Sequence, residues 1–187
     1  MIITRFFAIL IFFSVTVVAC AQNTKTDPEI DNFHTILSNL LKINNDKYTY
    51  VDSEGVKQPD SLKEFKAMEE IYIAYSKPDL PSKKFSEKHL KVLLFLAFIS
   101  EVNNNAAFLE YLAGDLMPIY GSNKKLFLDI LNEQPFLIPA ACDRLNAYFG
   151  FEGKNTNNKP DFLQQNVSDI KQELESKHAQ LCLDQFK

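Results

Sequence analysis

Tryptophan is absent from this chain of 187 residues, and glycine occurs only five times. With eight prolines as well, the composition is not that of a collagen-like or low-complexity chain. Apolar residues make up 46% of the sequence, and 16 of them are phenylalanines. The chain can therefore bury a sizeable core, and its length fits a single domain of ordinary size.

The sequence also lacks the short motifs that carry common chemistries. No G-x-S-x-G, H-E-x-x-H, P-loop or G-x-G-x-x-G pattern occurs. The adjacent carboxylates Glu69 and Glu70 diverge around a helix, whereas a glycosidase-type pair must face one cleft. His34, His89 and His178 each stand alone, and each is expected on a helix surface or near a cap. We therefore predict no catalytic residues, no cofactor and no bound metal.

A concentrated basic surface is missing too. The formal net charge is -4, and lysines alternate with acidic residues along the chain. The densest basic spots are the pairs Lys83–Lys84 and Lys124–Lys125, which are too short to follow a phosphate backbone. This charge pattern argues against a nucleic-acid partner.

The first 20 residues combine one positive charge with a short apolar run that ends at a cysteine. Arg5 precedes the run, which extends over 14 residues from Phe6 to Ala19. As a helix it would span about 21 Å, whereas the hydrocarbon core of a bilayer is about 30 Å thick. The run is therefore short for a membrane span and typical of a signal peptide.

The four residues Val17-Val18-Ala19-Cys20 resemble the lipobox of bacterial lipoproteins. The resemblance implies cleavage before Cys20, a diacylglycerol on its thiol and acylation of the new N-terminus. Residues 1–19 would then be the signal peptide and 20–27 a tether. Two or three acyl chains make a stable anchor, whereas one holds only marginally. Because Ala21 rather than aspartate follows, the enterobacterial sorting rule favours the outer membrane, with the domain facing the periplasm.

Two other routes remain open at this N-terminus. Ala19-Cys20-Ala21 also fits the A-x-A rule, and cleavage after Ala21 would give a soluble periplasmic or secreted protein. The apolar segment could instead stay in place as an uncleaved anchor. All three routes place the domain outside the cytoplasm.

Apolar residues recur with the period of a helix through the rest of the chain. We predict an all-α fold, an irregular bundle of about six or seven helices in a single domain at 28–187. Its centre is the very apolar helix at 86–102, because a helix that is apolar on every side is buried by its neighbours. The other predicted helices cover 28–43, 61–75, 106–117, 124–132 and 135–150, with a last one from about residue 160.

Several local features refine this prediction. Ser61 and Glu64 form a capping-box pattern at the start of the second helix. The polar stretch at 44–60 is expected to be a loop rather than a small hairpin. Residues 108–112 and 127–131 share the pattern F-L-acid-apolar-L, so a short HEAT-like helical array is the alternative architecture.

Once Cys20 is assigned to a lipid, Cys142 and Cys182 remain as an even pair. Exported compartments permit disulfides, and a bridge between these two would close a loop of about 40 residues. We predict that bridge. The alternatives are two buried free thiols, or a zinc site in which His178 joins both cysteines.

Tyrosine is enriched at protein interfaces, and Tyr48 and Tyr50 lie in the polar stretch before the second helix. We predict that this stretch contacts a protein partner.

The sequence as a whole predicts a lipid-anchored, non-enzymatic protein of the cell envelope, either an accessory factor or an inhibitor or immunity-type partner. The alternative is an envelope enzyme or ligand-binding protein with a cavity between its helices.

Overall fold

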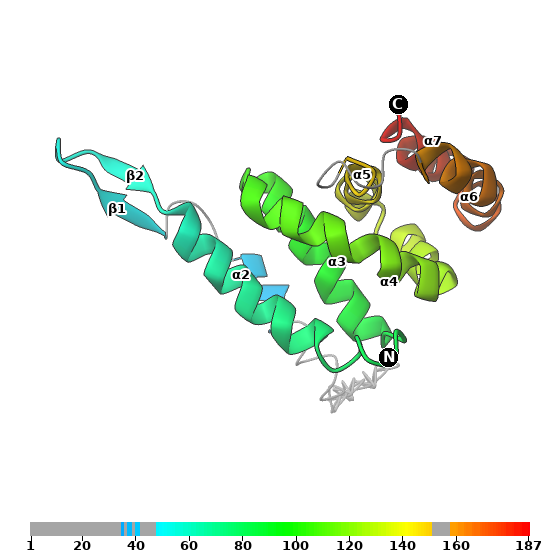
Figure 1. The fold of residues 1–187 in the computed structure, drawn as a ribbon, viewed down its shortest axis with the longest axis horizontal. Helices are drawn as coiled ribbons and strands as arrows, with labels where there is room; N and C mark the ends of the chain where they lie inside the picture. The colour runs from blue at the N-terminus through cyan, green and yellow to red at the C-terminus, as the bar shows by residue number, and fades with distance from the viewer. Residues whose placement is uncertain (1–34, 36, 39, 42–47, 151–157) are drawn as a thin grey trace, which may run out of the picture.

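The computed structural model describes residues 35, 37–38, 40–41, 48–150 and 158–187. The predicted signal peptide, Cys20, the tether and most of the helix at 28–43 lie outside these residues. The described part of that helix is helical, and its Leu40 is fully buried. The described chain is predominantly helical, which confirms the all-α prediction (Figure 1).

The α-helices with complete bounds differ greatly in length, from 9 residues to 28. In chain order the elements with complete bounds are β1 (Thr49–Val51), β2 (Lys57–Pro59), α2 (Ser61–Ser76), α3 (Glu87–Val102), α4 (Ala106–Glu133), the 3-10 helix η1 (Pro135–Leu137), α5 (Ile138–Ala147), α6 (Lys159–Glu173) and α7 (Ser176–Asp184). The two strands extend beyond the start of α2 at one end of the molecule, and α6 and α7 lie at the other (Figure 1). The bundle is therefore irregular, as predicted.

Helix α3 lies at the centre of the bundle, as its composition predicted. Nine of its sixteen residues are buried, and it contacts α2, α4 and α5. Ser86 caps its first turn, because the His89 amide donates to the Ser86 hydroxyl at 3.2 Å. Each fully buried leucine of α3 contributes about 1.5–3 kcal/mol through the apolar surface that it removes from water.

The capping-box prediction at the start of α2 is wrong in its details. Asp60 caps the helix instead, since its Oδ1 accepts from the Lys63 amide at 3.0 Å. The Glu64 side chain points inward and is buried. Its two carboxylate oxygens accept from Asn103 Nδ2 at 2.6 Å and from Asn105 Nδ2 at 2.8 Å. A buried carboxylate needs such donors, so Glu64 ties α2 to the turn before α4.

The two helices predicted at 106–117 and 124–132 both form, and they meet at a kink within the single element α4. The chain stays helical through Pro118 and departs from helical geometry only at Asn123, where φ is -134°. The Asn123 side chain accepts from the Phe85 amide at 2.9 Å and donates to the Lys83 and Ile119 carbonyls. These bonds connect the kink to the α2–α3 loop, a contact that a local pattern cannot reveal.

The last predicted helix is interrupted. Leu174 adopts an extended conformation, with φ -95° and ψ 145°, and so separates α6 from α7. The Asn132 side chain holds the break, because its Oδ1 accepts from the Glu175 amide at 3.2 Å and its Nδ2 donates to the Glu173 carbonyl. The break lets α7 turn back against α5, to which it is bonded covalently.

Candidate partner-binding hairpin

Residues 48–60 form an antiparallel hairpin, so the prediction of a loop here is wrong. Thr49 pairs with Pro59, Tyr50 with Gln58 and Val51 with Lys57. Two backbone hydrogen bonds close its ends, from Asp60 N to Tyr48 O at 2.6 Å and from Asp52 N to Val56 O at 2.9 Å. A hairpin is a more defined surface than a loop, because its side chains alternate between two faces.

Asp52 is the residue that organises the turn. Its Oδ1 accepts from the amides of Glu54 at 3.0 Å and Val56 at 2.9 Å, and its Oδ2 accepts from Gln58 Nε2 at 2.9 Å. Gly55 supplies the backbone conformation that the turn requires, with φ +79°. An aspartate that bonds backbone amides ahead of it is a recognised turn former, and here it replaces the Asn-Gly signal of tighter hairpins.

We expect the hairpin to lose order in acid. The hydrogen bonds from Gln58 and Val56 hold the pKa of Asp52 below its usual value. A carboxylate whose pKa is lower in the folded state stabilises that state fully above its unfolded pKa, and the contribution is lost as the pH falls through the folded value. The amide resonances of Val56 and Gln58 should therefore shift toward disordered positions below about pH 4.

Asp52→Ala is the control for this titration. It should disorder the hairpin at every pH and remove the pH dependence. Hairpin resonances that stay unchanged down to pH 2 in the unmodified protein would show that Asp52 does not organise the turn.

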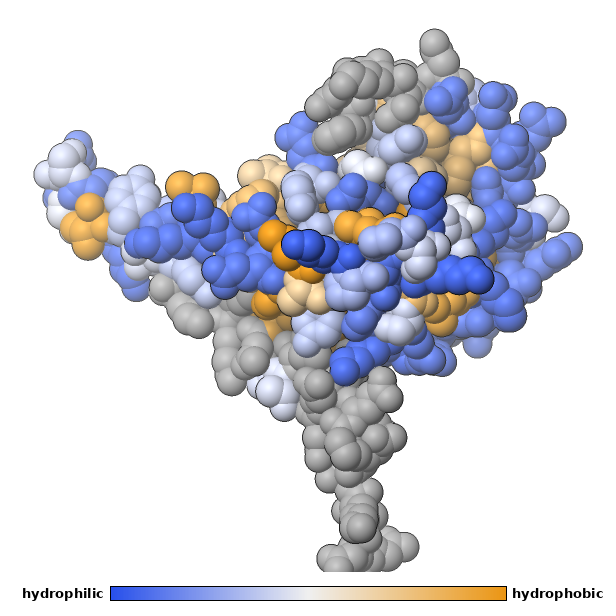
Figure 2. Space-filling view, turned by 60° about the horizontal axis from the view of Figure 1, so that its bottom comes forward, coloured by the Kyte–Doolittle hydropathy of each residue, from blue (hydrophilic) through white to orange (hydrophobic). Residues whose placement is uncertain are grey.

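Large side chains on this hairpin are exposed. The exposed fractions are 51% for Tyr50, 67% for Val51 and 49% for Val56. Figure 2 shows the hairpin as an arm that leaves the body of the molecule and carries hydrophobic residues at its end. A two-stranded hairpin has little stability by itself. Because these apolar side chains are exposed, they do not add to the buried core of the described chain. Such a surface is typical of a protein contact.

The two tyrosines singled out in the sequence have different environments. Tyr48 is half-buried and packs against the core, whereas Tyr50 points outward. All seven tyrosines are described, and Tyr50 is the only exposed one. Val51 and Val56 join it on the surface, and sequence reasoning missed both. Isolated valines give no signal of exposure unless the strand pairing is known.

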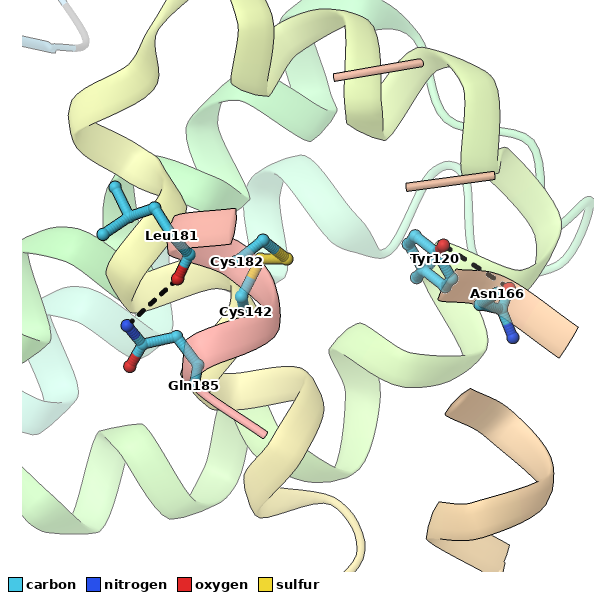
Figure 3. Close-up of a disulfide and its surroundings, with 6 residues drawn as sticks. All are labelled: Tyr120, Cys142, Asn166, Leu181, Cys182 and Gln185. Carbon is cyan, nitrogen blue, oxygen red and sulfur yellow. Dashed lines mark hydrogen bonds between the residues drawn. A yellow bond between two sulfur atoms is a disulfide. The ribbon is translucent and has the colours of Figure 1, made fainter. Parts of the chain in front are cut away.

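The hydroxyls of the two buried tyrosines form hydrogen bonds inside the bundle. Tyr72 donates to Asp115, and Tyr120 donates to Asn166 Oδ1 at 3.4 Å (Figure 3). Burial raises the pKa of both hydroxyls, and the adjacent Asp115 carboxylate raises that of Tyr72 further. Both therefore stay protonated and act as structural donors.

Cys142 and Cys182 form the predicted disulfide, with their Cα atoms 5.3 Å apart (Figure 3). Both residues are buried, and the bond connects α5 to α7. Because the bond consumes both thiols, the alternative zinc site with His178 is ruled out for this state. Among the described residues, no group of three or more His, Cys, Asp or Glu side chains is placed to hold a metal ion.

The histidines lie apart from one another. His89 is near the start of α3, as expected, and its Nδ1 lies 2.6 Å from Asp79 Oδ2. His178 lies in the first turn of α7, as the expectation of a position near a cap has it, but its side chain is buried rather than on the helix surface. His34 lies outside the described residues. Among the described residues, no hydrogen bond joins either histidine ring to a cysteine or serine side chain.

Two cavities between helices bear on the alternative function. One of about 320 Å³ lies between α4 and α5 and is lined mainly by small residues, with Glu110 and Arg144 at its wall. The Arg144 guanidinium already bonds the neighbouring Asp143 carboxylate. The other, of about 290 Å³, is largely aromatic and aliphatic around Phe98 and Phe136. Neither brings together a nucleophile, a base that activates it and donors for a developing charge.

Comparisons with protein-family models, curated proteins and solved structures found no significant match for this chain. Within the described residues, the helices are too short or too polar to cross a membrane. The assignment of the candidate site therefore rests on the geometry of the hairpin.

Proposed function

We propose that this protein is a lipid-anchored, non-enzymatic component of a bacterial cell envelope that binds another protein through its hairpin. The single observation that carries the binding proposal is the exposure of Tyr50, Val51 and Val56 on an arm that projects from the bundle. Binding energy at protein interfaces concentrates in a few large side chains, and tyrosine is prominent among them.

The proposed anchor depends on the N-terminal sequence. The Val17-Val18-Ala19-Cys20 lipobox supports lipidation of Cys20, and Ala21 supports sorting to the outer membrane, with the bundle in the periplasm. A polar tether at 20–27 would leave the hairpin free to reach a partner in the same compartment. An accessory factor of an envelope assembly, or an inhibitor or immunity-type protein, fits a small helical domain of this kind.

The anchor is tested by intact-mass analysis of protein extracted from membranes. We expect a chain that begins at Cys20 and carries three acyl chains, and we expect Cys20→Ser to move the protein to the soluble fraction. The same spectrum reports the Cys142–Cys182 bond as a deficit of two hydrogens. Membrane retention of the Cys20→Ser protein would contradict the lipid anchor.

Binding is tested by substitution of the exposed hairpin residues. Tyr50→Ser combined with Val51→Ser should reduce the partner recovered after chemical cross-linking in intact cells by at least about tenfold. Leu181→Ser is the matched control, because Leu181 is 39% exposed and lies on α7 at the other end of the molecule. Equal recovery from both variants would contradict binding through the hairpin.

A further inference from the structure

The two edges of the hairpin differ in what they offer to another backbone. Asp60 N bonds Tyr48 O, and Asp52 N bonds Val56 O, so the hydrogen-bonded pairs of this antiparallel ladder fall on even-numbered residues. Pairs alternate along such a ladder. The backbone groups of the odd-numbered residues, Thr49 and Val51 on β1 and Lys57 and Pro59 on β2, therefore point outward.

The β2 edge is poorly suited to a further strand. Proline has no amide hydrogen, so Pro59 offers only a carbonyl, and Lys57 places a charged side chain on the same short strand. Proline and lysine are the residues by which natural sheets blunt an exposed edge. The sequence thus protects one side of the hairpin against pairing.

The outer edge of β1 is unpaired within the part of the chain that the structure describes. Thr49 and Val51 each present an N–H and a C=O, and no residue in the described part of the chain bonds these groups. The sheet has only two strands among those residues. Val51, the most exposed large apolar residue there, lies on this edge strand next to Tyr50. An open edge with exposed apolar side chains is the arrangement that takes up an extended peptide.

The charge of the hairpin favours a partner segment that carries a basic residue. Its described residues carry three acids, Asp52, Glu54 and Asp60, and one base, Lys57. Asp52 is bonded within the turn and Asp60 pairs with Lys63 at 3.1 Å. Glu54, exposed at the tip, forms no ion pair with a described residue. A basic residue of a partner would complement this end of the hairpin.

We propose that the partner adds an extended strand to the outer edge of β1. In this arrangement the backbone of the partner bonds the N–H and C=O groups of Thr49 and Val51. One of its apolar side chains packs against Val51, and a basic residue lies near Glu54 at the turn. The inference rests on the proposed function, and it specifies the recognised partner as an extended segment of another protein with alternating apolar residues and a basic end.

The test compares two proline variants that differ in the edge they block. Thr49→Pro removes an outward amide hydrogen of β1 and leaves the β1–β2 ladder intact, and Lys57→Pro does the same on β2. A photo-reactive phenylalanine analogue at position 56 captures the partner in cells. We expect Thr49→Pro to lower the yield of the cross-linked complex about tenfold and Lys57→Pro to change it less than about twofold.

Two further variants separate the backbone from the side chains. Thr49→Val keeps the amide and should retain the complex, whereas Glu54→Lys should lower its yield severalfold. Strand addition is overturned if the complex survives Thr49→Pro. It is also overturned if both proline variants lose the complex equally while the amide spectrum shows a folded hairpin. Neither result overturns the proposed function. An adduct of twice the mass of this chain would identify a second copy and overturn the assignment to another protein. If the hairpin without these substitutions gives no adduct at all, the proposed function itself is contradicted.

Discussion

Replacement of Cys142 and Cys182 by alanine is expected to lower the free energy of unfolding by about 3–4 kcal/mol. The bond closes a loop of 40 residues between α5 and α7, and its removal frees that loop in the unfolded chain. The loop contains all of α6, so in the unfolded chain the cross-link restricts about a quarter of the residues of the domain. Domains of this size have a net stability of about 5–15 kcal/mol, so the loss is a large fraction of the total.

Denaturant titration of the Cys20→Ser protein, with and without the two further substitutions, measures this loss. The slope of the free energy against denaturant concentration should also increase, because an unbridged unfolded chain exposes more surface. If the free energy of unfolding falls by less than about 1 kcal/mol, the disulfide adds little to the stability that the packing of α6 and α7 already provides.

Phe108→Ala is expected to cost about 3–5 kcal/mol. The Phe108 side chain is fully buried at the start of α4, and its ring packs against those of Phe65 at 5.5 Å, Tyr72 at 6.5 Å and Tyr111 at 5.7 Å. Its removal leaves a cavity where α2 meets α4. The edge-to-face arrangement of Phe65 and Tyr72 against its ring is lost as well.

Phe136→Ala makes the same chemical change at a site that is 49% exposed. Phe136 contacts Phe95 and Phe98 from one side, so its removal leaves an open surface rather than a closed cavity. We expect a cost below about 1.5 kcal/mol from the same denaturant titration. Equal costs at the two positions would contradict the placement of Phe108 in the core.

The helical framework followed from periodicity because burial repeats along a helix at a fixed spacing. The central position of the helix at 86–102 could be predicted because its residues are apolar on every side. Turns that depend on distant side chains were not readable. Asn123 bends α4 because it bonds residues 83 and 85, and Asn132 holds the break at Leu174. Glu64 was assigned to a cap because its buried donors, Asn103 and Asn105, lie about 40 residues away along the chain.

The candidate site was predicted in part. Tyr50 was identified because tyrosine in a polar segment is a recognisable signal. Its presentation on a strand was not, because the turn contains no two-residue Asn-Gly or Asp-Gly pair and depends on three bonds to the Asp52 carboxylate. Without the strand register, neither the exposure of Val51 nor the difference between the two edges can be derived.

Photo-cross-linking in cells reports directly whether the protein binds a partner through its hairpin. The photo-reactive analogue is placed at position 50 in one variant and at position 181 in another, with the anchor at Cys20 intact. We expect a discrete adduct with another envelope protein from position 50 and none from position 181. No adduct from position 50, or the same adduct from both positions, would contradict binding through the hairpin.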